Sequence, residues 1–135
     1  MEIKKITDYN ISELKALYDA LEWYSYTKDI EKFAEMFTHS LGVFAAFDDD
    51  LLVGLIRVIG DKTHILYIQD ILVLPSYQRK GIGKKLLKHV TTIYKDVRQK
   101  VLITDADSVS ANKFYESVGF KKNTDYKINC YLRFD

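Results

Sequence analysis

The sequence predicts a mixed α/β or α+β fold with the element order β-α-α-β-β-β-α-β-α-β. Three observations support this fold class. The spacing of apolar residues alternates between the strand period of two and the helix period of 3.6 along the chain. Two apolar runs in residues 41–61 flank an acidic turn, as in a β-hairpin. A third apolar run, in residues 64–75, leads through a glycine-containing turn directly into a helical pattern.

The first half of the chain predicts two helices between strands. Residues 1–8 alternate apolar and charged side chains, which indicates a short strand. Residues 11–23 carry apolar side chains at helical spacing, and Asn10 or Ser12 could cap this helix. A second, shorter helix is expected in residues 29–40.

The second half of the chain predicts one more crossover and a final strand. Helical spacing runs from Ile82 to Val97, and residues 100–107 form a short strand. A helix in residues 110–120 ends at Gly119, and residues 125–134 alternate as a terminal strand would. Early hairpins and one β-α-β crossover together predict a mixed, mostly antiparallel sheet flanked by helices.

Length and composition limit the classes of protein. The 135 residues contain no linker rich in proline or glycine, so we expect a single domain spanning residues 1–135. The net charge of +1 gives no general attraction to nucleic acid or to an anionic membrane. No apolar run approaches the roughly 20 residues that a transmembrane helix needs. Cys130 is the only cysteine, which excludes an internal disulfide and favours a reducing, cytoplasmic location.

Metal chemistry is not expected. The three histidines, His39, His64 and His89, are scattered and have no partner at the spacing of a zinc site. Cys130 lies in an apolar alternation that is typical of a small core residue.

The stretch QRKGIG, residues 78–83, predicts an anion site. The first turn of a helix has N–H groups without an intrahelical partner, and the helix dipole makes that end partially positive. Gly81 and Gly83 have no Cβ, so a ligand can approach the backbone closely. Full positive charges surround the same turn, carried by Arg79, Lys80 and Lys84. A phosphate or pyrophosphate is the expected occupant, whereas the simpler alternative is a charged turn before a solvated helix.

Two familiar phosphate loops do not match this turn. A P-loop needs a Ser or Thr hydroxyl where Lys85 stands, and its glycines are farther apart. A dinucleotide fingerprint needs a third glycine where Leu86 stands.

The segment DILVLPSYQRKGIGKKLL instead resembles the coenzyme A-binding motif of the GCN5-related N-acetyltransferase (GNAT) superfamily. That motif reads Gln or Arg, two residues, Gly, one residue, then Gly or Ala, and it is matched by Gln78, Gly81 and Gly83. A second cofactor segment of the family is similar to SANKFYESVGF, residues 110–120. The predicted order of strands and helices also fits the family's fold, so the resemblance covers most of the chain.

The resemblance implies how acetyl-coenzyme A would bind. The loop amides of the family grip the pyrophosphate, and here they belong to Gln78, Arg79, Lys80, Gly81, Ile82, Gly83 and Lys84. The preceding strand splays from its neighbour in similar proteins, so the backbone of Leu72 and Val73 would pair with the pantetheine arm. Asn112 corresponds to a contact with the cofactor arm. The alternatives are core positions for Leu72 and Val73 and a helix-surface position for Asn112.

The same resemblance places a proton donor at Tyr115, which would return a proton to the departing thiolate. The ordinary phenol pKa of about 10 is close enough to that of a thiol for this transfer. Tyr115 could instead be a packing residue beside Phe114 and Phe120.

Asp70 is the candidate base. Strict alternation places this carboxylate in an apolar row of the strand, so it must be hydrogen-bonded or have a raised pKa, and the raised pKa would suit a base. Relatives often carry a β-bulge here, which would instead turn Gln69 and Tyr67 toward the acceptor. Both readings remain open from the sequence.

The expected function is an acetyl-coenzyme A-dependent N-acetyltransferase that acts on a primary amine of a small molecule by direct attack. A protein N-terminal or lysine acetyltransferase is the alternative enzyme, and a non-catalytic acyl-coenzyme A-binding module is the alternative from another class. Dimers are frequent in the family, so a homodimer is compatible with the resemblance.

Overall fold

The computed structural model describes all 135 residues as two compact units, residues 1–102 and residues 103–135. The first unit contains a sheet and most of the helices. Its strands and helices are β1 (Glu2–Lys5), α1 (Ile11–Ala20), α2 (Tyr24–Thr27), α3 (Ile30–Thr38), β2 (Gly42–Asp48), β3 (Leu51–Gly60), β4 (Ile65–Val73), the 3₁₀ turn η1 (Pro75–Tyr77), α4 (Ile82–Ile93) and β5 (Gln99–Leu102). The second unit holds α5 (Val109–Ser117) and the 3₁₀ turn η2 (Asn123–Tyr126).

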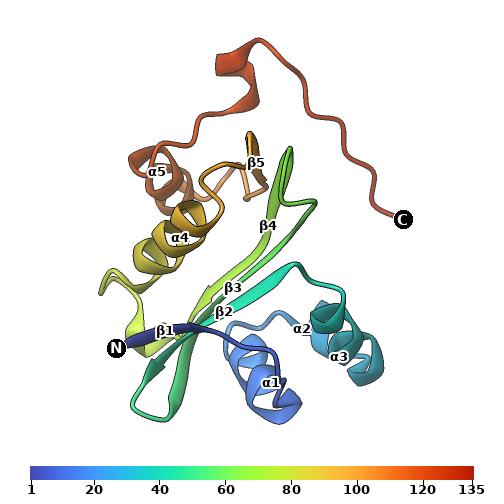
Figure 1. Cartoon of the computed structure of the whole chain (residues 1–135), viewed down its shortest axis with the longest axis vertical. Helices are drawn as coiled ribbons and strands as arrows, with labels where there is room; N and C mark the ends of the chain where they lie inside the picture. The colour runs from blue at the N-terminus through green and yellow to red at the C-terminus, as the bar shows by residue number, and fades with distance from the viewer. The chain divides into compact units, whose positions relative to one another are not determined.

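The five strands lie in sequential order, from β1 at one edge to β5 at the other. The pairs β1–β2, β2–β3 and β3–β4 are antiparallel, and β4–β5 is parallel. Helix α4 covers one face of the sheet, and α1 to α3 lie on the other face (Figure 1). The predicted mixed, mostly antiparallel sheet flanked by helices is confirmed.

The face beneath α1 and α3 holds an apolar core. The largest side chains of this core that come from the helices are fully buried: Leu14, Leu17, Tyr18, Phe33 and Phe37. Burying a side chain of this size contributes on the order of 1.5–3 kcal/mol, so this core holds the two helices on the sheet. Tyr18 is the member with a polar end, and its hydroxyl must find a partner inside.

The helical spacing predicted after the glycine turn is also confirmed. Helix α4 buries Ile82, Leu86, Leu87 and Val90, which recur at intervals of one to four residues along one face. The regular helix ends at Ile93, so Val97 lies beyond the helix and is nevertheless buried.

The N-terminal helices differ in number from the expectation. Asn10, rather than Ser12, caps α1 by accepting a hydrogen bond from the Glu13 N–H at 3.2 Å. The chain then forms the one-turn helix α2 before Asp29 caps α3. The extra turn carries Tyr24 and Tyr26, and it brings one of these tyrosines into the site described below.

Strand β4 contains an irregularity at Gln69. Arg57 of β3 is opposite Asp70, whereas the next residue, Val58, is opposite Ile68, so Gln69 has no partner across the ladder. An extra residue of this kind exchanges the faces of the residues on one side of it. Tyr67, which is paired with Ile59, therefore lies on the same face as Asp70, and strict alternation along β4 fails at this point.

The predicted terminal strand in residues 125–134 is absent, and this expectation was wrong. Residues 123–126 form η2, the chain after it has no regular structure, and every residue from 121 to 135 is exposed. An alternating pattern forms a strand only where a neighbouring strand accepts its backbone hydrogen bonds, and no strand pairs with this segment. Cys130 is consequently exposed instead of buried.

The second unit is otherwise as expected. Ser108 caps α5 by accepting from the Ala111 N–H at 3.3 Å, and Gly119 follows the helix with a φ of 97°. That the whole chain forms one domain stays a prediction. None of the helices is long and apolar enough to cross a membrane.

Candidate active site

The turn before α4 has the backbone conformation of an anion site. Arg79 and Gly81 both adopt left-handed conformations, with φ of 64° and 83°. When left-handed and right-handed backbone conformations alternate, successive N–H groups point toward one concave side. Gly81 is the N-cap of α4 and supplies no side-chain cap, and a Cβ placed on it would meet no atom within 4 Å. The first hydrogen bond of α4 runs from the Lys85 N–H to the Gly81 carbonyl oxygen, so the N–H groups of Ile82, Gly83 and Lys84 have no partner within the helix.

The cations around this turn are not neutralised by carboxylates. Arg79, Lys80 and Lys84 are exposed, and none of them forms an ion pair. The Lys80 ammonium lies 5.2 Å from the centre of the Tyr77 ring, a cation–π distance that keeps it beside the turn. The turn thus combines open amides with unpaired positive charge.

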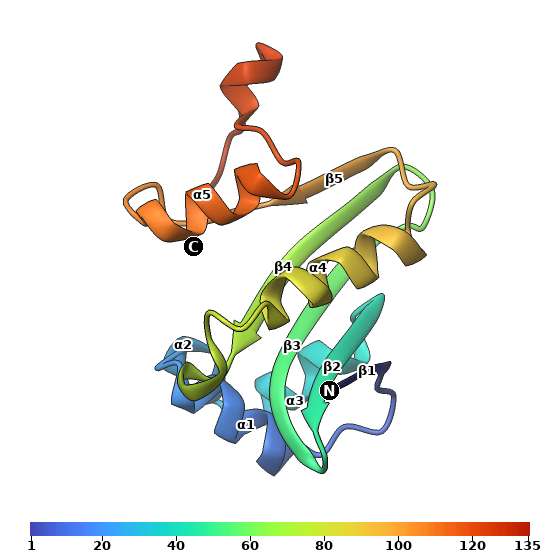
Figure 2. The same cartoon turned by 90° about the vertical axis from the view of Figure 1, so that its left-hand side faces the viewer.

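One edge of β4 is open next to the turn. Strand β5 pairs with β4 only from Ile65 to Ile68 and ends there, at Leu102, so no strand of the sheet pairs with β4 on this side from Gln69 to Val73 (Figure 2). The backbone groups of an antiparallel strand point alternately toward and away from its neighbour. The Leu74 N–H donates to the Val53 carbonyl oxygen of β3 at 2.8 Å, so Ile71 and Val73 direct their backbone groups away from β3, into the open edge.

This alternation alters the expectation for the two backbone positions on β4. Val73 and Ile71 direct their backbone groups into the open edge, whereas Leu72 directs its N–H and carbonyl toward β3. That this part of β4 pairs with the pantetheine arm stays a prediction. The Val73 carbonyl already accepts a hydrogen bond from Gln78 Nε2 at 3.0 Å. Gln78 therefore ties the glycine turn to the end of β4, and the Val73 N–H is left for another partner.

Asp70 is hydrogen-bonded on every side. Its Oδ2 accepts from Arg57 Nε at 2.6 Å and from the Tyr18 hydroxyl at 2.8 Å, and its Oδ1 accepts from the Tyr26 hydroxyl at 2.6 Å. Asp70 is 1% exposed and Arg57 is 4% exposed, so this is a buried ion pair. Of the two states that the sequence left open for a carboxylate in an apolar row, the structure contains the hydrogen-bonded one.

Sequence reasoning missed Arg57, the cation of this cluster. The signal was a single arginine in the otherwise apolar strand LLVGLIRVIG, which cannot be buried without a counter-charge. Arg57 also donates through Nη1 to Ser40 Oγ at 3.2 Å, so its guanidinium is fixed at two points.

The cluster reaches the surface through Tyr26. Gln69 Nε2, on an exposed side chain, donates to the Tyr26 hydroxyl oxygen at 3.0 Å. The Tyr26 ring stacks on Trp23, with centroids 5.9 Å apart and an angle of 24°. Burial, followed by the negative charge of Asp70, raises the pKa of Tyr26 above 10.0, so the phenol stays protonated at neutral pH.

The two predicted residues of the second unit lie on α5. The Asn112 side-chain amide donates to the carbonyl oxygens of Asp105 at 2.9 Å and Ser108 at 2.7 Å, which holds the loop before the helix. The Tyr115 ring packs beside Phe114 and Phe120, as the packing alternative required. Burial raises the pKa of Tyr115, which suits a proton donor and not a base. Their roles toward a ligand stay predictions.

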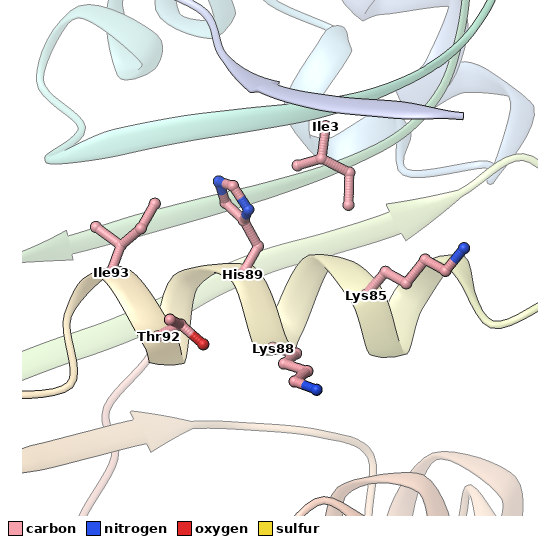
Figure 3. A pocket seen from close by; sticks show the side chains of 6 residues that line it. All are labelled: Ile3, Lys85, Lys88, His89, Thr92 and Ile93. Atoms are coloured by element: carbon pink, nitrogen blue, oxygen red, sulfur yellow. The ribbon is translucent and has the colours of Figure 1, made fainter.

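A separate shallow hollow of about 380 Å³ lies between β1 and α4 (Figure 3). Ile3 and His89 point toward one another across it, while Lys88 points away. It contains none of the predicted site residues. No group of three or more metal-ligating side chains gathers anywhere in the chain.

Comparisons with known proteins agree with this geometry. The family model described as "Acetyltransferase (GNAT) domain" matches residues 7–134. Over its whole length the chain is similar to N-alpha-acetyltransferase 50 of Danio rerio, with 28% identity and 82% of that protein covered. It is 27% identical to histone acetyltransferase TAP1 of Glycine max over 84% of the chain, and the match spans about half of that relative, 53%.

Among solved structures, the chain is similar to the GNAT family protein SP0256 from Streptococcus pneumoniae TIGR4. The two are 34% identical with a TM-score of 0.87, over 99% of this chain and 97% of that one. The agreement of fold therefore extends along the whole length of both proteins.

Proposed function

Because the chain belongs to the acetyltransferase (GNAT) family, we propose that it transfers the acetyl group of acetyl-coenzyme A to a primary amine of a small molecule. The family membership confirms the resemblance drawn from the two motifs and the predicted enzyme class, N-acetyltransferase. The acceptor and the residues that act on it are the subject of the proposal.

The observation that carries the proposal is the continuity of the glycine turn with the open edge of β4. The turn offers amides and unpaired cations, which suit a pyrophosphate. The neighbouring edge offers the backbone of Ile71 and Val73, which suits the amide groups of a pantetheine arm. Phosphate and arm are joined in coenzyme A in this order, so the thioester would lie along β4.

The reaction follows from these positions as a direct transfer. The amine nitrogen bonds to the thioester carbonyl carbon, the carbonyl oxygen becomes negative, and an N–H group of the open edge stabilises it. The carbon–sulfur bond then breaks, the nitrogen loses a proton, and the thiolate takes up a proton, a role that the family resemblance assigns to Tyr115. No acyl-enzyme is needed, because the amine attacks the thioester directly.

The acceptor side is the cluster around Asp70. Asp70 remains the proposed final site for the amine proton, and a water held by Gln69 or Tyr67 is the alternative. The stack of Trp23 on Tyr26 supports a small amine, because it offers one polar atom on a flat aromatic wall. Asn112 is proposed to contact the cofactor arm, and the cations of the turn its phosphates.

A second candidate acceptor is a protein N-terminus or lysine. It is favoured by the names of the curated relatives, an N-alpha-acetyltransferase and a histone acetyltransferase. A homodimer is also compatible with the proposal.

The test separates these candidates. Calorimetry with coenzyme A, desulfo-coenzyme A and ATP measures whether the turn selects the proposed ligand. Thiol release is then followed with a panel of small primary amines and with short peptides that have free N-termini or lysines. Turnover on small amines supports the proposal, turnover on peptides alone supports the second candidate, and binding without any turnover indicates a non-catalytic module.

A further inference from the structure

Two tyrosines donate to the same carboxylate, but they differ in what else they can do. Tyr18 is 0% exposed and its hydroxyl has Asp70 as its hydrogen-bond partner, so it can only hold the carboxylate. Tyr26 is half-buried and sits between Asp70 and the exposed Gln69. It thereby connects the buried carboxylate to an exposed side chain.

The hydrogen bonds of Tyr26 fix the direction in which its oxygen can act. A phenol has one O–H donor and two acceptor positions. The O–H is used on Asp70, and one acceptor position is used by Gln69 Nε2. The remaining position can only accept a hydrogen bond, so Tyr26 offers an incoming molecule a site for an N–H group.

The site lies near the open edge of β4. Gln69, whose side chain touches Tyr26, is two residues before Ile71 on the same strand, a separation of about 7 Å. An amine held at the Tyr26 oxygen would therefore be close to an acyl group lying along that edge.

We propose that Tyr26 is a catalytic residue, which accepts a hydrogen bond from the acceptor amine and relays its proton to Asp70. This inference rests on the proposed function and adds a residue that neither motif predicts. The nitrogen becomes cationic as its lone pair bonds to the carbonyl carbon, so it readily gives up a proton. The N–H bond breaks as that proton bonds to Tyr26 Oη, and the original Tyr26 proton passes to Asp70 Oδ1.

The relay moves one proton from the amine to Asp70 and changes no other protonation state. Tyr26 is neutral before and after the transfer, and the carboxylate becomes a neutral acid beside Arg57. The Arg57 guanidinium, held by Asp70 and Ser40, keeps the carboxylate in place throughout. Asp70 thus receives the proton without touching the substrate, which explains how a carboxylate with 1% exposure can serve an amine.

The test compares Tyr26→Phe with Tyr24→Phe, the same chemical change two residues earlier on the same short helix. Tyr24 is 56% exposed and outside the cluster, so its variant controls for handling and folding. We expect Tyr26→Phe to lower kcat/KM for the amine by about 10²–10⁴-fold, the range of a lost acid–base group, with unchanged coenzyme A affinity. A solvent isotope effect on kcat should differ between Tyr26→Phe and the wild type, because one of two moving protons is lost.

The outcomes are distinguishable. If the wild type turns over and Tyr26→Phe stays within about threefold of it, less than the loss of one acid–base group, the relay is wrong and the proposed function stands. If the wild type binds coenzyme A but neither acetylates nor binds any amine, both fail. Calorimetric titration of the amine into the complex with desulfo-coenzyme A measures whether the amine binds. A drop in melting temperature for Tyr26→Phe alone, with kcat/KM retained, also overturns the relay.

Discussion

The glycine turn and the Asp70 cluster lie at two points of one strand-and-turn segment, yet they are built in opposite ways. The turn is local, because its conformation and charges come from consecutive residues, 78–84. The cluster joins α1, α2, β3 and β4, whose contributing residues are up to 52 positions apart. A local site can change its side chains without loss of the fold, whereas a buried non-local site supports binding and folding at once. Four changes sharpen this difference.

The largest effect on stability is expected from Arg57→Ala. Removing one partner of a buried ion pair leaves Asp70 charged without its guanidinium, which typically lowers the free energy of unfolding by about 3–5 kcal/mol. Urea unfolding followed by circular dichroism measures this loss. A double variant, Arg57→Met with Asp70→Leu, should recover much of it, and a double variant as unstable as Arg57→Ala would contradict the ion-pair explanation.

At the glycine turn, the largest effect is expected from Gly81→Glu, and it should be on coenzyme A binding and not on stability. The new carboxylate would repel the phosphates and lower coenzyme A affinity by about 100-fold, of the order of one lost charged hydrogen bond or more. The cost in folding is limited to the left-handed φ of 83°, about 1–2 kcal/mol. Gly81→Ala carries this strain without the charge, so calorimetry on both variants separates them. Equal affinity of the two variants would show that the turn does not bind an anion.

Tyr18→Phe tests the buried support of Asp70. Loss of its hydroxyl should lower the free energy of unfolding by about 1.5–3 kcal/mol, the cost of one hydrogen bond to a charged group. Burial, followed by the charge of Asp70, raises the pKa of Tyr18 well above 10.0.

The sign of the pH dependence follows from that shift. A group with a raised pKa in the folded state contributes its stability below its unfolded pKa, about 10, and the contribution disappears as the pH rises above that value. Wild-type stability should therefore fall above about pH 10, and Tyr18→Phe should fall less steeply. If the free energies of unfolding of the wild type and Tyr18→Phe change in parallel from neutral to alkaline pH, the raised pKa does not belong to Tyr18.

The smallest effect is expected from Lys84→Ala. An exposed cation without a carboxylate partner should contribute only a few-fold to phosphate affinity, and high salt should screen most of it. Calorimetry at low and high ionic strength measures the difference. Lys88→Ala, one turn later on the same helix, is the control and should leave the coenzyme A affinity unchanged. If Lys84→Ala lowers the coenzyme A affinity equally at low and high salt, Lys84 makes a specific contact instead.

The sequence by itself determined the features that depend on neighbouring residues. The period of apolar residues in α4, the caps and the glycine turn with its two motifs arise from local hydrogen bonding and side-chain spacing. These were enough for the family and for the order of elements through α5, apart from the one-turn helix α2.

Only the tertiary structure decided the features that need two segments to meet. The bulge at Gln69 brought Tyr67 and Asp70 to one face, the ladder turned Ile71 instead of Leu72 to the open edge, and Arg57 found Asp70 across the sheet. The alternating residues 125–134 looked like a strand but had no partner to complete their hydrogen bonds. Register and pairing are properties of two strands together, and the pattern within one strand does not contain them.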